Sequence, residues 1–171
     1  SEIYPKVTII GLGLVGASIA LAARRGALAG QITGCDIADG VDLEGARLGL
    51  VDQFDADPAH AVADADLVIM AVPVGAMGTL SQTIIPHMKK GATLTDTGST
   101  KRSVMRDVAP HLSADINWLP SHPLAGTEHS GPAAGLTELF DGRYWIILPL
   151  DNDDETVDRF ESFVTGLGSV C

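Results

Sequence analysis

Three glycines spaced as Gly-x-Gly-x-x-Gly stand near the start of the chain, and they constrain its fold more than any other feature. The motif reads Gly11-Leu12-Gly13-Leu14-Val15-Gly16. It follows directly on the β-branched and apolar run Val7–Ile10 and opens the stretch Leu14–Arg25, which is apolar on nearly every helical face. The order of strand, glycine turn and buried helix is typical of a dinucleotide-binding unit in a parallel sheet.

Each glycine has its own task in such a unit. Gly11 permits the tight turn, Gly13 lets the backbone approach a pyrophosphate, and Gly16 lets the helix pack closely on the strand. The N-terminus of the helix also offers N–H groups to phosphates. We therefore expect the whole loop to bind the cofactor. The competing interpretation is a flexible turn followed by an exposed aspartate.

An acid at the end of the second predicted strand indicates which dinucleotide fits. Asp36 closes the strand Gln31–Asp36 and lies 20 residues after Gly16, where a carboxylate can accept hydrogen bonds from an adenosine ribose. The residues that follow, Ile37-Ala38-Asp39, include no Arg or Lys to pair a 2′-phosphate, and a carboxylate would repel one. The sequence therefore favours NAD over NADP.

The rest of the chain alternates strand and helix. Further strands are expected at Asp66–Val72, Ala92–Asp96, Ile116–Leu119 and Tyr144–Pro149. Helical patterns lie near Leu43–Leu48, at Pro58–Ala65, from Pro73 to about Pro86, and at Lys101–His111 and Asp153–Leu167. This alternation predicts an α/β fold with a doubly wound, mostly parallel sheet of the Rossmann type, in one dinucleotide-binding domain over residues 1–171. Gly168–Cys171 reads as a loop entering another strand, so we expect the architecture to continue beyond residue 171.

Composition excludes several classes of protein. The 171 residues suit about one domain, and 46% are hydrophobic, enough for a buried core. The chain has 22 acidic and 11 basic residues, which gives a net charge of −11. This charge repels nucleic acid and anionic membrane surfaces. Cys35 and Cys171 fit no zinc spacing, and no cluster suggests a metal site. No stretch reads as a membrane span or signal peptide, so we expect a cytoplasmic protein.

The carboxyl ends of the later strands carry the remaining candidate residues. Val72 and Pro73 end the third strand, where open α/β sheets bind ligands, although a plain strand end is the competing interpretation. Two polar loops follow the fourth and fifth strands, over Asp96–Lys101 and Ser121–Glu128. We expect Thr97 and Gly98 of the first loop to contact the cofactor, and both loops to meet the substrate beside the nicotinamide.

His122 is the candidate catalytic base. It follows a strand end and precedes a proline, which restricts its backbone to an extended conformation. Removal of a hydride from an alcohol needs a base for the hydroxyl proton, and a neutral imidazole suits that task near pH 7. The competing interpretation is a turn residue that bonds only the backbone.

Four other polar residues are candidates for the substrate pocket, each with an alternative. Ser99 either orients the imidazole and the reacting hydroxyl or caps the helix that starts near Lys101. Lys101 either neutralises a substrate carboxylate or is a solvated lysine of the first helical turn. Thr127 and Glu128 either contact substrate or close a gate, or they belong to a solvated loop.

Taken in order, these segments resemble one known family. The sequences GLGLVGAS, ADLVIMAVPV, TDTGSTK, SHPLAGTEHSG and LFDGRYWIILP, with Asp36 between the first two, resemble the nucleotide-binding domain of the prephenate/arogenate dehydrogenases of tyrosine biosynthesis. The resemblance covers residues 5–170. It implies NAD-dependent oxidative decarboxylation of prephenate to 4-hydroxyphenylpyruvate, or of arogenate to tyrosine.

The resemblance also implies roles for particular residues. His122 matches the histidine that hydrogen-bonds the ring hydroxyl and takes its proton, and Ser99 matches a serine that helps to position both. Thr127 and Glu128 match positions near the substrate pocket. Family members continue into a helical second domain that forms a homodimer and supplies further substrate contacts, which this chain does not contain.

Two alternatives remain open from the sequence. One is a related Rossmann-type dehydrogenase of β-hydroxyacids or imines, for which we would expect a catalytic lysine on a later helix. The other is a non-catalytic NAD-binding module, in which replacement of His122 would leave every function intact.

Overall fold

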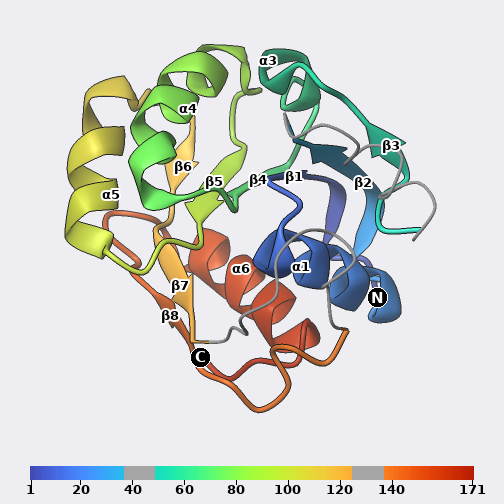
Figure 1. Cartoon of the computed structure of the whole chain (residues 1–171). Coiled ribbons are helices and arrows are strands. Elements are labelled where there is room, and N and C mark those ends of the chain that lie inside the picture. Colours follow the sequence, from blue (N-terminus) through green and yellow to red (C-terminus); the bar gives the residue numbers. More distant parts are fainter. Residues whose placement is uncertain (37–48, 125–136) are drawn as a thin grey trace.

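A six-stranded parallel sheet forms the centre of the computed structural model, which describes residues 1–36, 49–124 and 137–171. Its spatial order is β3-β2-β1-β4-β5-β6, so the chain starts in the middle, builds outward to one side, and crosses to the other (Figure 1). The strands are β1 (Tyr4–Ile10), β2 (Ala29–Cys35), β3 (Gln53–Phe54), β4 (Leu67–Met70), β5 (Thr93–Asp96) and β6 (Asn117–Trp118). This is the predicted doubly wound arrangement.

Helices cover both faces of the sheet. The α-helices are α1 (Leu14–Arg25), α3 (Pro58–Ala61), α4 (Met77–Ile84), α5 (Lys101–Val108) and α6 (Asp154–Gly166). Three 3-10 turns adjoin them, η1 (Val74–Ala76), η2 (Ile85–His87) and η3 (Ala109–His111). Residues of α1 and α6 pack in one buried cluster, and residues of α3, α4 and α5 pack in a second. The sheet therefore has a hydrophobic core on each side.

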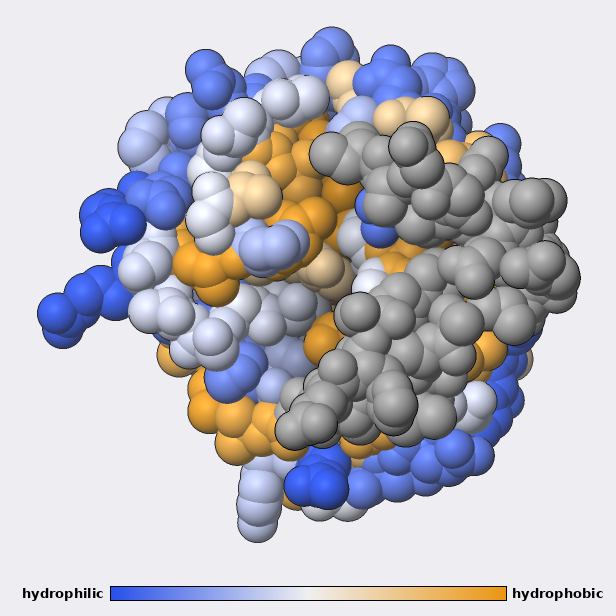
Figure 2. All heavy atoms as spheres, in the orientation of Figure 1, coloured by the Kyte–Doolittle hydropathy of each residue, from blue (hydrophilic) through white to orange (hydrophobic). Residues whose placement is uncertain are grey.

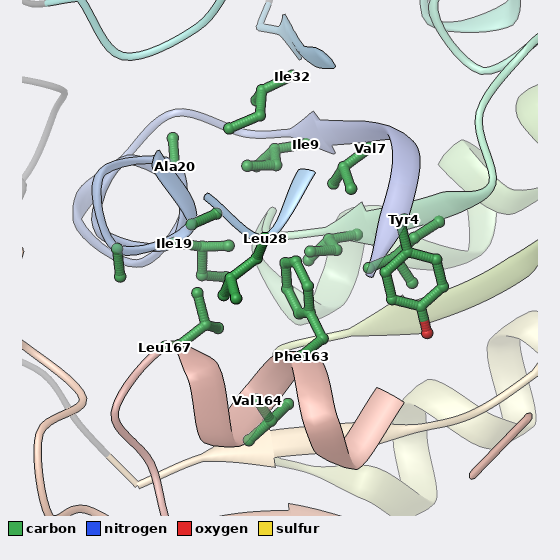
Figure 3. Packing of buried hydrophobic residues seen from close by; sticks show 14 of the residues in the cluster. Tyr4, Val7, Ile9, Ile19, Ala20, Leu28, Ile32, Phe163, Val164 and Leu167 are labelled. Carbon is green, nitrogen blue, oxygen red and sulfur yellow. The ribbon is translucent and has the colours of Figure 1, made fainter. Parts of the chain in front are cut away.

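Small side chains bring α1 close to the sheet. Ala17, Ala20 and Ala22 are fully buried along this helix, and alanine is also the residue with the highest helix propensity. The helix stops at Gly26, and Leu28 then fills the space between α1, β1 and α6 (Figure 3). The predicted bounds Leu14–Arg25 are confirmed.

The last helix completes the core on that face. Asp153 caps α6 by accepting a hydrogen bond from the Thr156 N–H at 2.8 Å. The helix buries Phe160, Phe163 and Val164, and Figure 3 shows Phe163 directed from α6 toward Leu28 and the residues of β1. The ring of Phe163 meets Tyr4 edge to face, with centroids 5.6 Å apart.

A second, two-stranded sheet was not predicted. Strands β7 (Ser121–Pro123) and β8 (Trp145–Ile147) pair antiparallel, and we call them the ribbon. The prediction that Tyr144–Pro149 forms a sixth strand of the parallel sheet is therefore wrong, because the segment pairs with β7 instead. The parallel sheet still has six strands, because the two-residue strand β3, which the sequence analysis did not identify, forms one of its edges.

Other predicted elements differ only in length. The strands predicted at Asp66–Val72 and Ile116–Leu119 are shorter in the structure, and the helix predicted at Pro58–Ala65 ends at Ala61. The helical pattern near Leu43–Leu48 lies outside the described residues. No helix in the described ranges combines the length and the apolar character that crossing a membrane requires.

Candidate active site

Four parallel strands end at one edge of the sheet, which we call the carboxyl edge. In the register of the sheet, Ile10 at the end of β1 lies beside Cys35 of β2 and Met70 of β4, and Met70 lies beside Asp96 of β5. The segments that follow these strands therefore emerge side by side. Ligands of open parallel sheets bind at this edge.

The glycine loop, Gly11–Gly16, turns across the middle of this edge. Gly11 has a φ of +98°, a left-handed conformation, and a Cβ there would lie 2.4 Å from the carbonyl oxygen of Ala71. A Cβ on Gly16 would lie 1.8 Å from the carbonyl oxygen of Gly11. Both positions therefore require glycine for the fold itself.

Gly13 differs from its two neighbours in the motif. Among the described residues, no heavy atom lies within 4 Å of a Cβ built at this position. Gly13 is also the N-cap of α1, so the unpaired N–H groups of the first helical turn point out beside this open space. An anion fits there because these N–H groups and the helix dipole both favour negative charge.

Asp36 reaches the glycine loop from the end of β2. Its Oδ2 accepts a hydrogen bond from the Leu12 N–H at 2.7 Å, so the acid and the loop are held together. A cavity of about 270 Å³ opens beside it. Its lining residues are Ile10, Gly11, Cys35, Asp36, Pro58, Val72, Ala76, Thr79, Leu80 and Thr83. In Figure 2, apolar surface lines a hollow between the parts of the molecule that Figure 1 labels α4 and α3.

This cavity suits a flat apolar group next to a polar one. Burial, together with the nearby acids Asp55 and Asp36, raises the pKa of the Cys35 thiol to about 12, so the thiol stays neutral. Val72 contributes to the wall, whereas Pro73 is exposed and precedes η1. The neutral wall and the Asp36 carboxylate together match a nucleoside, with its base against the wall and its ribose at the acid.

Beyond β4, the end of β5 brings the predicted residues Thr97 and Gly98 to the same edge. The Thr97 N–H donates to the Met70 carbonyl at 3.2 Å, and the buried Gly98 donates to Asp96 Oδ2 at 2.9 Å. Ser99 is exposed and stands one residue before Thr100, the N-cap of α5. The alternative that Ser99 caps this helix is therefore wrong.

His122 lies on β7 rather than in the loop that the sequence analysis expected. Its Cα pairs with that of Ile146 across the ribbon, and the residue is half-buried. Burial lowers the pKa of its imidazole, the charge of Lys101 lowers it further, and Asp96 acts in the opposite direction. His122 is therefore neutral near pH 7, as a general base must be.

Lys101 does not project freely from α5. Its Nζ contacts Asp96 Oδ2 and donates to the Ser121 carbonyl at 2.6 Å, and its side chain is only 17% exposed. The alternative of a solvated lysine is therefore wrong. Asp96 and Ser121 are central to this cluster, and the sequence analysis gave neither residue a role. Thr127 and Glu128 lie outside the described residues.

Known proteins match both the sequence and this geometry. Residues 19–171 match the family model described as the nucleotide-binding domain of prephenate dehydrogenase. The chain belongs to the prephenate dehydrogenase family. It spans about half the length of the curated relatives that it matches. One of them, the cyclohexadienyl dehydrogenase of Zymomonas mobilis, is 40% identical over 147 residues, which make up 86% of this chain and 50% of that protein.

Solved structures of the family have the same fold. Prephenate dehydrogenase from Aquifex aeolicus, in complex with hydroxyphenyl propionate and NAD+, superposes with a TM-score of 0.86 at 28% identity. The match covers 96% of this chain and 58% of that one. Arogenate dehydrogenase from Synechocystis gives a TM-score of 0.87 at 25% identity, over the same shares of the two chains.

Proposed function

We propose that this chain is the NAD-binding part of a dehydrogenase that oxidatively decarboxylates prephenate or arogenate in tyrosine biosynthesis. The observation that carries the proposal is the position of His122. Its half-buried imidazole stands next to the cluster at the end of β5, on the same edge as the glycine loop. The family membership of the chain supports the same reaction.

The carboxyl edge supplies the residues that would hold NAD. The pyrophosphate would lie over Gly13 and the start of α1, and the adenosine beside Asp36 and Val72. Pro73, Thr97 and Gly98 would line the way to the nicotinamide. When bound, NAD accepts a hydride from the substrate ring.

His122 would receive the proton of the substrate's ring hydroxyl. As the hydride leaves the carbon that bears this hydroxyl, positive charge develops there, and a neutral imidazole relieves it by taking up the proton. The ring carboxylate departs as carbon dioxide, its bonding electrons complete the aromatic ring, and the proton returns to the phenol oxygen. Ser99 would help to hold the hydroxyl, while Thr127 and Glu128 stay sequence-based candidates for the pocket.

The test is NADH formation by the protein with prephenate and with arogenate, each supplied separately with NAD. A rate with either substrate supports the proposal and identifies the preferred one. A His122→Asn variant is expected to lose at least about a hundredfold in kcat, the range of general-base catalysis, with NAD binding unchanged. NAD binding without turnover on either substrate, in the protein with its full set of domains, would contradict the proposed reaction.

The family resemblance assigns the homodimer interface and additional substrate contacts to a helical domain beyond residue 171. The cytoplasm is the expected location, because NAD and the proposed substrates are small soluble metabolites. Gel filtration with light scattering on the longer protein tests the dimer.

A further inference from the structure

A buried carboxylate connects the two segments that carry the candidate catalytic residues. Asp96 at the end of β5 is fully buried. Its Oδ2 accepts from the Gly98 N–H at 2.9 Å and from Lys101, and its Oδ1 accepts from the Ser121 N–H at 3.2 Å. The Ser121 hydroxyl donates to the Asp96 carbonyl at 2.8 Å and lies 2.8 Å from Thr95 Oγ1. One side chain therefore fixes both the loop after β5 and the start of β7.

Lys101 holds the peptide bond next to the candidate base. Its Nζ donates to the carbonyl oxygen of Ser121 at 2.6 Å, and that carbonyl belongs to the planar peptide that joins Ser121 to His122. The Ser121 N–H, on the other side of the same residue, is held by Asp96. Together the two charged groups set the orientation of the backbone from which the imidazole projects.

A contribution to stability does not by itself explain why Asp96 and Lys101 are buried as a pair. Two charges removed from water gain little net stability from each other, so a buried ion pair is weak grounds for a stabilising role. An ammonium group has three N–H donors, and Lys101 directs two of them at protein oxygens. These two bonds fix the Ser121 carbonyl and the Asp96 carboxylate relative to each other.

We propose that Asp96 and Lys101 are positioning residues, which hold the Ser121–His122 peptide and thereby aim the imidazole at the substrate hydroxyl. This inference rests on the proposed function, because it assigns the pair to the same reaction. It is an alternative to the prediction that Lys101 neutralises a substrate carboxylate, and the tests below distinguish the two. In this role neither residue would touch the reacting atoms.

The first test is kinetic. Lys101→Met is expected to lower kcat by roughly 10- to 100-fold, since a displacement of about 1 Å costs that much, while the KM for substrate and the Kd for NAD change less than about threefold. Lys101→Arg, which keeps the charge and the N–H donors, is expected to retain more activity than Lys101→Met. Lys90→Met, at an exposed lysine before β5, is the matched control and is expected to behave as the wild type.

A double variant separates orientation from a general loss of folding. Lys101→Met alone leaves the Asp96 carboxylate buried without its cation, whereas Asp96→Asn with Lys101→Met removes both charges. The kcat losses of Lys101→Met and of Asp96→Asn, each made alone, are therefore expected not to multiply in the double variant. Circular dichroism and calorimetric NAD titration on every variant check that the nucleotide site is intact.

An NMR titration does not depend on turnover and reads the His122 ring directly. In Lys101→Met, the loss of the cation is expected to raise the pKa of His122 toward its ordinary value of about 6.5 and to shift the Ser121 amide resonance. If the wild type turns over neither substrate, the proposed function fails while this titration still tests the positioning role. An unchanged imidazole pKa, an unchanged kcat, or a rise in KM alone would overturn the inference, the last because it marks Lys101 as a substrate contact.

Discussion

The three glycines of the glycine loop have different roles, two in the fold and one at the proposed binding site. Gly16 and Gly11 are required because backbone oxygens lie 1.8 and 2.4 Å from where a Cβ would stand. Gly13 faces open space among the described residues. The six-residue motif therefore contains two structural glycines and one whose missing side chain leaves room for a ligand.

This difference gives a matched pair of substitutions. Gly16→Ala is expected to lower the free energy of unfolding by roughly 1–3 kcal/mol, the usual cost of overpacking. Gly13→Ala, at an N-cap, is expected to cost less than about 1 kcal/mol and yet to weaken NAD binding about tenfold or more. Urea unfolding and calorimetric titration measure the two effects. Equal loss of stability in both variants would contradict the assignment.

The charge of Asp36 is expected to set the choice between NAD and NADP. Asp36→Asn keeps an oxygen that can accept the Leu12 N–H, so the loop stays in place while the repulsion of a 2′-phosphate disappears. We expect the ratio of kcat/KM for NAD to that for NADP to fall at least about tenfold. An unchanged ratio in a variant that still folds would remove Asp36 from this role.

The pH dependence should report the burial of His122. Because burial and the Lys101 charge lower its pKa, the imidazole loses its proton at a lower pH than a free histidine does. As the pH falls through this pKa the base becomes protonated, so kcat/KM is expected to fall on the acid side, below about pH 6.5. A pH series with the wild type and with His122→Asn measures this limb, which the variant should lack.

At the scale of elements, local patterns predicted most of the fold. The glycine motif and the apolar run after it were enough for β1 and α1, because both depend on neighbouring residues. The ribbon was missed because its partners lie more than 20 residues apart, and an apolar run such as Tyr144–Pro149 does not reveal which strand it pairs with. Two-residue strands such as β3 give too short a pattern to recognise.

The candidate site was predictable to the same extent. His122, Asp36 and the glycine loop have signals in the sequence, a histidine before a proline and a fixed motif spacing. Asp96 and Ser121 lie 25 residues apart and acquire their roles only through a hydrogen bond across two sheets. The sequence spacing of Asp96 and Ser121 does not indicate such a contact. The cluster next to His122 could therefore be recognised only in the three-dimensional structure.

Helix α6 offers a test of the core at this scale. Phe163 is fully buried between β1 and α1, and its neighbour Ser162 is exposed on the same helix. Phe163→Ala is expected to lower the free energy of unfolding by about 3–5 kcal/mol, through lost burial and a cavity. Ser162→Ala, the control, should change it by less than about 0.5 kcal/mol in the same urea titration.

At the scale of the whole molecule, the residues proposed to bind the nucleotide gather at one edge of the parallel sheet. The glycine loop, Asp36 and Val72 follow the ends of three strands of a single sheet, which has a hydrophobic core on each face. We therefore expect this chain to bind NAD by itself. NAD at a hundred times its Kd should stabilise the fold by about 2.7 kcal/mol, which differential scanning calorimetry can detect as a higher Tm. An unchanged Tm would contradict a preformed site.

The junction between the two sheets has a consequence for how such a protein diversifies. The residues proposed to bind the cofactor follow strands of the parallel sheet, whereas the candidate base belongs to the ribbon, and the two sheets are joined through Asp96 and Lys101. Substitutions in the ribbon can therefore alter the surroundings of His122 while the glycine loop and Asp36 stay the same. Directed evolution of substrate choice is best aimed at positions such as Ile146, opposite His122, with the glycine loop left untouched.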